Sequence, residues 1–164
     1  MTFYLDIDGV MIPAKSWEAP PLLSDGFPAF SKQAVETLLA VLNETDEIIL
    51  TTSHKSNFTL LDWKNIFATR GIPIKRLSAL PENINHRSRL QELLDWFNQH
   101  PHTGSFVILD DDTGLNNLPQ AIKQHLVLTS STVGLVSQHI ETIKVLRGKL
   151  ETALNSHLTM SVNK

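Results

Sequence analysis

Short apolar runs alternate with helix-like segments along the whole chain, and this alternation constrains its fold more than any other feature. Five runs have the character of buried parallel strands: Thr2–Ile7, Glu47–Leu50, Ile72–Leu77, Phe106–Leu109 and Leu126–Leu128. Parallel strands need right-handed crossovers, which helices provide. The pattern therefore predicts an α/β fold, a three-layer doubly wound (Rossmann-like) parallel sheet with helices on both faces.

The segments between these runs carry apolar side chains at helical spacing. Ser31 is placed to cap the first helix, and Gly71 with Pro73 ends the second. A short helix is expected over residues 118–125. The apolar faces of the other helices comprise Val35, Leu38, Leu39 and Leu42; Leu60, Trp63, Ile66 and Phe67; Leu90, Leu93, Leu94 and Phe97; and Ile140, Ile143, Leu146 and Leu150.

The length and composition are those of one globular domain. The chain has 164 residues, 41% of them hydrophobic, so we expect a single domain over residues 1–157 and a tail over residues 158–164. No secretory signal or membrane-spanning run is visible, which by default predicts a cytoplasmic protein without a membrane partner. The net charge of -3 gives no general attraction for nucleic acid. The absence of cysteine excludes disulfides and thiolate metal sites.

Polar clusters follow three of the predicted strands. Asp6 and Asp8 end the first, residues 51–53 (Thr-Thr-Ser) end the second, and residues 110–112 (three aspartates) end the fourth. In open parallel sheets, ligands bind outside the carboxyl ends of the strands. An aspartate after a strand also commonly closes a turn or caps a helix, but three such clusters together favour a binding site at this edge.

Carboxylates that converge at one edge raise each other's pKa or require a cation. The available ligand atoms are carboxylate and carbonyl oxygens, without cysteine or a histidine cluster. Such a set suits a hard divalent ion, and Mg²⁺ often bridges a carboxylate to a substrate phosphate. The sequence therefore predicts Mg²⁺ as the cofactor.

The residues at these strand ends resemble the motifs of the haloacid dehalogenase-like hydrolases. Residues 6–10 (DIDGV) resemble the first motif, residues 48–53 (IILTTS) the second, and residues 107–111 (VILDD) the fourth. Together with the late residues 132–135 (TVGL), they resemble the branch associated with Swiss-army-knife RNA repair proteins. The likeness spans about residues 3 to 135.

This resemblance implies phosphoryl transfer through an aspartyl-phosphate. Asp6 would attack phosphorus, and Asp8 would protonate the leaving oxygen and then activate water. The resemblance places Mg²⁺ on Asp6, on the main-chain carbonyl of Asp8, and on Asp110 or Asp111. The chain between the first two predicted strands has room for a loop and one helix, so no large cap domain is expected.

Further residues are candidates for binding the substrate phosphate. The resemblance assigns a phosphoryl contact to Thr52 or Ser53, and we also expect Gly9 and Lys55 to approach the phosphate. Where the family has a lysine before the fourth strand, this chain has Arg89 and Arg87, of which the spacing favours Arg89. Arginine binds phosphate bidentately but is bulkier than lysine.

The expected function is Mg²⁺-dependent hydrolysis of a phosphomonoester. An open site suits a macromolecular substrate, so a nucleic-acid end or a nucleotide is the candidate partner. The arginine in place of lysine also permits an alternative from another class, a catalytically weak binding or regulatory module of the same fold.

Overall fold

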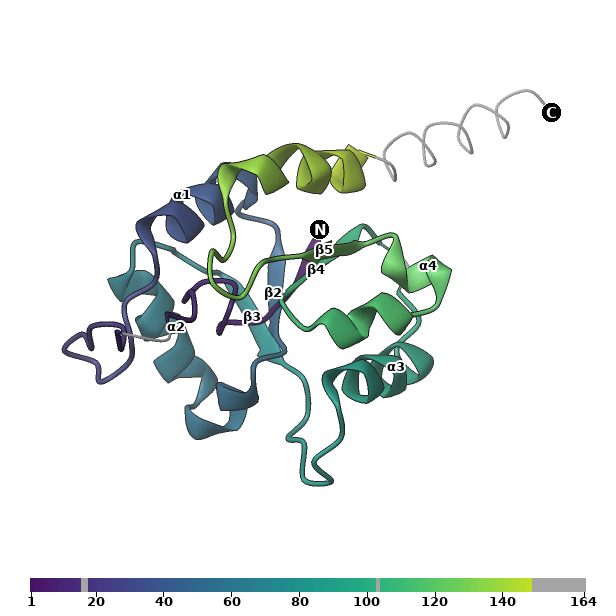
Figure 1. Cartoon of the computed structure of the whole chain (residues 1–164), viewed down its shortest axis with the longest axis horizontal. Helices are drawn as coiled ribbons and strands as arrows, with labels where there is room; N and C mark the ends of the chain where they lie inside the picture. Colours follow the sequence, from purple (N-terminus) through teal and green to yellow (C-terminus); the bar gives the residue numbers. More distant parts are fainter. Residues whose placement is uncertain (16–17, 103, 149–164) are drawn as a thin grey trace.

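The computed structural model describes residues 1–15, 18–102 and 104–148, and they form the predicted α/β fold. One parallel sheet has the strand order β3-β2-β1-β4-β5 (Figure 1). Its strands are β1 (Thr2–Leu5), β2 (Glu47–Leu50), β3 (Arg76–Ala79), β4 (Phe106–Asp110) and β5 (Leu126–Leu128). The order reverses direction between β1 and β4, which creates a switch point beside the central strand.

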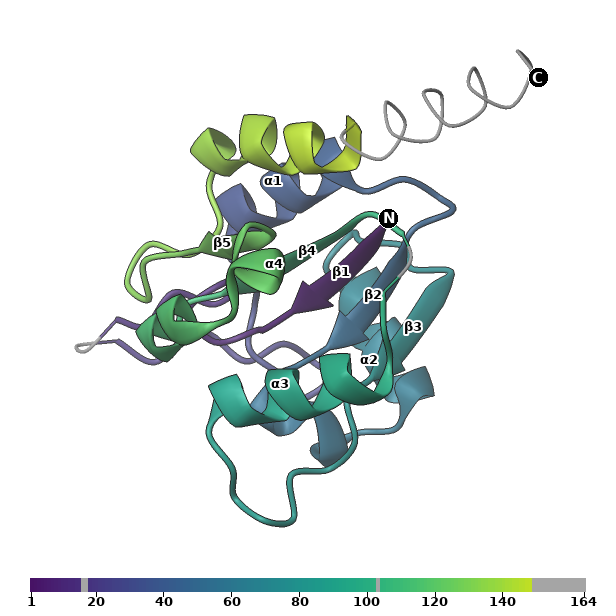
Figure 2. The same cartoon turned by 90° about the vertical axis from the view of Figure 1, so that its right-hand side faces the viewer.

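Helices connect the strands and cover both faces of the sheet. The α-helices are α1 (Lys32–Val41), α2 (Leu60–Thr69), α3 (Arg89–Gln99) and α4 (Gln120–Lys123). Short 3-10 helices are η1 (Ser53–Asn57), η2 (Thr113–Asn117) and η3 (Ser137–His139), and residues 140–148 are also helical. Figure 2 shows α1 beside residues 140–148 on one side of the sheet and α3 on the other.

The two faces of the sheet form two separate hydrophobic cores because successive side chains of a strand point to opposite faces. Phe3 and Leu5 of β1 face α1, α2 and the helical residues 140–148, whereas Tyr4 faces α3 and η2. The first core includes Ala34, Leu38, Trp63, Phe67, Ile143 and Leu146, and the second includes Leu93, Phe97, Ile108, Leu115 and Leu118.

Two predicted strands have different bounds. The first ends at Leu5 rather than Ile7, because the carbonyl of Ile7 accepts hydrogen bonds from the amides of residues 10–12 in a tight turn. The third is Arg76–Ala79 rather than Ile72–Leu77. Ile72 donates its amide to Phe67 at the end of α2, so pairing with β2 begins only at Arg76.

The helices lie where the sequence predicts them, with one shorter element, but Leu39 and Leu60 of the expected apolar faces are exposed. Ser31 caps α1 as expected, but the helix predicted over residues 118–125 is only α4, since η2 and a turn come before it. Of the terminal helix, Ile143 and Leu146 are buried, whereas Leu150, the predicted domain end at residue 157 and the tail over residues 158–164 lie outside the described residues. Among the described helices, none has the length and apolar character needed to span a membrane.

A proline-containing loop over residues 18–30 is held against α2 by one buried arginine. Arg70, at the C-terminal end of α2, donates from Nε and Nη2 to the carbonyl of Pro28, at 2.9 and 2.7 Å. Its guanidinium also binds the carbonyl oxygens of Phe27 and Ile66, both at 2.7 Å, and both carboxylate oxygens of Asp25. All its nitrogens are therefore engaged, and the loop has a fixed anchor on the helix.

We expect Arg70→Met to lower the free energy of unfolding by about 3 kcal/mol or more, because it leaves Asp25 and three carbonyl oxygens without their donor. Urea denaturation measures this change. Lys75→Met is the matched control, because Lys75 makes an exposed ion pair with Glu44 and should hardly affect stability. Equal stability of the two variants would contradict the anchoring role.

The ion pair between Arg70 and Asp25 makes the stability of the fold depend on pH. The hydrogen bond from Arg70 holds the pKa of Asp25 below its ordinary value of 3.8. The stabilisation is therefore complete above that value and is lost as the pH falls through the lower pKa of the folded state. Asp25→Asn should flatten the acid limb of a plot of unfolding free energy against pH, and an unchanged acid limb would refute this origin.

Candidate active site

The register of the central strands brings three polar residues into one row at the carboxyl edge of the sheet. Leu5 of β1 pairs with Leu50 of β2 and with Leu109 of β4, so the next residues are Asp6, Thr51 and Asp110. The row is held by backbone hydrogen bonds of 3.0 Å, from Asp6 N to Leu109 O and from Thr51 N to Leu5 O. The site is thus built at the switch point of the fold.

Three carboxylates meet at this edge of the sheet. Asp6, Asp110 and Asp111 each offer one oxygen, and these oxygens lie within 4.8 Å of one another. Asp6 and Asp110 are only 6% and 1% exposed, and Oδ2 of Asp110 is buried with no hydrogen-bond partner in the described part of the chain. A buried, incompletely satisfied carboxylate among other carboxylates fits a hard cation, so this cluster could bind a metal ion.

The surroundings of these acids disfavour their charged forms. Burial raises the pKa of Asp6, and the negative charge of Asp110 adds to that effect, against the opposing charge of Arg89. Burial likewise raises the pKa of Asp110 despite Arg89, and it raises that of Asp111. Arg89 alone therefore does not compensate the cluster, and an additional cation would favour its ionised form.

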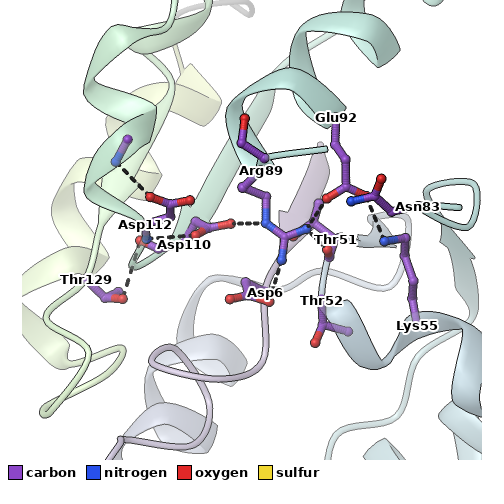
Figure 3. Close-up of polar contacts among 12 residues, drawn as sticks. Asp6, Thr51, Thr52, Lys55, Asn83, Arg89, Glu92, Asp110, Asp112 and Thr129 are labelled. Carbon is purple, nitrogen blue, oxygen red and sulfur yellow. Dashed lines mark hydrogen bonds and ion pairs between the residues drawn. The ribbon is translucent and has the colours of Figure 1, made fainter. Parts of the chain in front are cut away.

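Arg89, the first residue of α3, is the cation at this cluster (Figure 3). Its Nη2 donates to Asp6 Oδ1 at 3.3 Å, and its Nε lies 3.2 Å from Asp110 Oδ2, at ion-pair distance without hydrogen-bond alignment. Nη1 donates to the carbonyl of Thr51 and to Glu92 Oε2, the latter at 3.1 Å. One guanidinium thus joins the ends of β1, β2 and β4.

Two other predicted phosphate-binding cations are not at the cluster. Arg87 precedes α3, is exposed, and pairs with Asp95 on the surface of that helix. Lys55 is 5% exposed, and its Nζ donates to Glu92 Oε1 at 2.9 Å. In this structure each of these side chains is bound to a carboxylate, Arg87 to Asp95 and Lys55 to Glu92, and their expected phosphate contacts stay predictions.

The polar residues after β2 differ in their surroundings. Thr52 is fully buried and caps η1, where its Oγ1 accepts a weak hydrogen bond of 3.4 Å from His54 N. Ser53 is exposed. Thr51 lies beside Asp6 in the row, and its buried Oγ1 has no hydrogen-bond partner among the described residues. Thr52 and Ser53 thus differ in burial, and the phosphoryl contact expected of one of them stays a prediction.

Gly9 belongs to the loop that follows Asp8, and its expected contact with the substrate phosphate stays a prediction. Its N–H already donates to Ile12 O at 2.8 Å. The residue has a φ of +71°, and a Cβ there would lie 2.1 Å from Asp111 Oδ2. Thr129 Oγ1 donates to the Gly9 carbonyl at 2.8 Å. Because Gly9 has no side chain, Asp111 can approach the loop closely. Thr129, the residue directly after β5, binds the loop through its hydroxyl.

Asp8 lies at the outer side of the cluster. Its side chain is 57% exposed, and Oδ2 lies 2.9 Å from His54 Nε2. The carboxyl group of Asp8 is thus accessible to solvent, in contrast to Asp6, which is buried. This difference places one carboxylate against the cation and another where a leaving group or a water molecule can reach it.

Sequence reasoning missed Glu92 and Thr129, which bind the residues of the site rather than forming its surface. Both pairings span long sequence separations: 37 residues between Lys55 and Glu92, and 120 between Gly9 and Thr129. A carboxylate three residues after Arg89 on a predicted helix was the available signal for Glu92. For Thr129 the available signal was its position directly after a predicted strand.

A comparison with protein families agrees with this architecture. Searches of curated proteins and of solved structures gave no match. A family model described as the HAD domain in Swiss Army Knife RNA repair proteins matches residues 2–140, which include all strands and the acidic cluster. The fold, the cluster at the switch point and this match together show that the chain belongs to the HAD domain family of Swiss Army Knife RNA repair proteins.

Proposed function

We propose that this chain is a Mg²⁺-dependent phosphatase that hydrolyses a phosphomonoester through an aspartyl-phosphate on Asp6. The observation that carries the proposal is the buried carboxylate of Asp6 beside Asp110, Asp111 and Arg89. Membership of a hydrolase superfamily supports the reaction class. A carboxylate can act as the nucleophile when neighbouring positive charge brings an anionic phosphate within reach.

The donor set suits Mg²⁺. Asp6, Asp110 and Asp111 would hold the ion with the main-chain carbonyl of Asp8, and the unsatisfied Oδ2 of Asp110 supports this assignment. When bound, the ion supplies positive charge that reduces repulsion between the carboxylates and the phosphate.

Residues of the chain carry out the bond-making and proton-transfer steps. Asp6 forms a bond to phosphorus while the bond to the leaving oxygen breaks, and Asp8 gives that oxygen a proton. Asp8 then takes a proton from water, whose oxygen bonds to phosphorus as the bond to Asp6 breaks. Arg89 orients Asp6 and stabilises negative charge, and Thr52 or Ser53 supplies a hydroxyl to the phosphoryl oxygens.

A nucleic-acid end or a nucleotide is the proposed substrate class. The support is the family description, which refers to RNA repair proteins. Among the described residues no cap domain is inserted after β1 or between β3 and α3, and the second connection, residues 80–88, contains no helix or strand. Such connections leave room for a macromolecular end above the strand ends.

We expect Asp6→Asn to reduce phosphate release by roughly 10³-fold or more, because the amide is nearly isosteric but is not a nucleophile. Release from nucleotides and from 3′- and 5′-phosphorylated oligonucleotides should be measured with Mg²⁺ and with EDTA. The chelator should abolish the wild-type activity.

Asp112→Asn is the matched control, because Asp112 caps η2 and asparagine caps equally well. It should retain activity, and circular dichroism should show that both variants are folded. Undiminished release by Asp6→Asn would refute the nucleophile. No release by the wild type from any substrate would favour the alternative, a module that binds phosphate without turnover.

We expect Arg89→Ala to lower kcat by about 10²-fold, whereas Arg87→Ala should change it by less than about twofold. Arg89 contacts Asp6 and Asp110, but Arg87 is paired with Asp95 on the surface. Steady-state kinetics on the substrate that the wild type hydrolyses fastest compare kcat of the two variants. The opposite order of effects would reassign the catalytic cation.

A further inference from the structure

Glu92 lies between two cations that belong to different parts of the fold. Its Oε1 accepts from Lys55 Nζ at 2.9 Å, and its Oε2 accepts from Arg89 Nη1 at 3.1 Å (Figure 3). The side chains are shielded from solvent, with exposed fractions of 3% for Lys55 and 12% for both Glu92 and Arg89. Because water screens these charges less than it screens surface charges, the attraction within these ion pairs is stronger than within surface pairs.

The local structure explains how these groups meet. Ser88 caps α3, so Arg89 and Glu92 lie three residues apart in its first turn and project from the same side. Lys55 comes from η1, directly after the end of β2. Among the described residues, Glu92 is the only carboxylate at ion-pair distance from Lys55. The chain Lys55–Glu92–Arg89 therefore links the segment after β2 to the start of α3.

The guanidinium of Arg89 is held by the carbonyl of Thr51 and by three carboxylates, those of Asp6, Asp110 and Glu92. Nη2 faces Asp6 and Nε faces Asp110, while Glu92 binds the opposite side of the group through Nη1. Arginine has a long side chain that can carry its charge toward solvent. A carboxylate behind the guanidinium opposes that movement and orients its plane toward the two aspartates.

We propose that Glu92 is a positioning residue for Arg89, with Lys55 holding Glu92 in place. The kinetic consequence rests on the proposed function, because it requires Arg89 to act on Asp6 during phosphoryl transfer. The positioning is a structural property that can be measured without turnover. An electrostatic group is most effective in catalysis when its orientation is fixed before the reaction.

The kinetic test uses Glu92→Gln, which keeps the size of the side chain and removes its charge. We expect kcat to fall about tenfold with little change in KM, because the lost alignment acts on the reacting carboxylate. Glu36→Gln is the matched control, since Glu36 makes an exposed ion pair with Lys32 on α1, away from the site. Unchanged kcat in Glu92→Gln would overturn the proposal.

A double-mutant cycle separates positioning from general structural support. In the Arg89→Ala background, Glu92→Gln should change kcat by less than about twofold, because the group that it positions is absent. An equal loss in both backgrounds would show that Glu92 acts through the fold rather than through Arg89, and would overturn the proposal.

Nuclear magnetic resonance supplies the readout that needs no substrate. The Nε–H signal of Arg89 is assigned as the one lost in Arg89→Lys, and we expect Glu92→Gln to shift or broaden it while Glu36→Gln leaves it unchanged. An unmoved signal in Glu92→Gln refutes positioning even if the wild type is an active phosphatase. A moved signal supports it even if no substrate releases phosphate, in which case only the proposed function fails.

Discussion

Backbone pairing of β1 with both β2 and β4 is the interaction on which the site depends. Side chains at the carboxyl edge lie side by side only because these three strands share one register. A shift of one residue in either pairing would turn Asp110 or Thr51 toward the opposite face of the sheet. The buried apolar residues before each of these positions, Leu5, Leu50 and Leu109, oppose such a shift because each packs into the same core.

That register concentrates negative charge where water is largely excluded, and the rest of the site compensates for it. Arg89 neutralises part of the charge, and Oδ2 of Asp110, which has no hydrogen-bond partner among residues 1–15, 18–102 and 104–148, could still bind a cation. Glu92 introduces another carboxylate nearby, but it shares its charge between Arg89 and Lys55. Positive and negative groups therefore alternate from the end of β4 to η1, an arrangement that suits buried ions.

The sequence was informative wherever a residue's role followed from its own strand or helix. The strand ends at Asp6, Thr51 and Asp110 could be placed at one edge because parallel strands present their carboxyl ends together. Details that depend on a distant partner were not visible. No local pattern shows that Lys55 turns inward to Glu92. The strand at Arg76 likewise starts late, because Ile72 remains bound to the end of α2.

The origin of Arg89 has a consequence for how the site forms during folding. The guanidinium reaches Asp6 across 83 residues of sequence and reaches the Thr51 carbonyl across 38. Closing such long loops costs entropy before their contacts form. Strands β1 and β2 can pair before α3 docks on the other face of the sheet, and until then Asp6 lacks its cation. Docking of α3 therefore brings Leu93 and Phe97 into the second core and Arg89 to Asp6 together, so that packing of this face and placement of the cation are coupled.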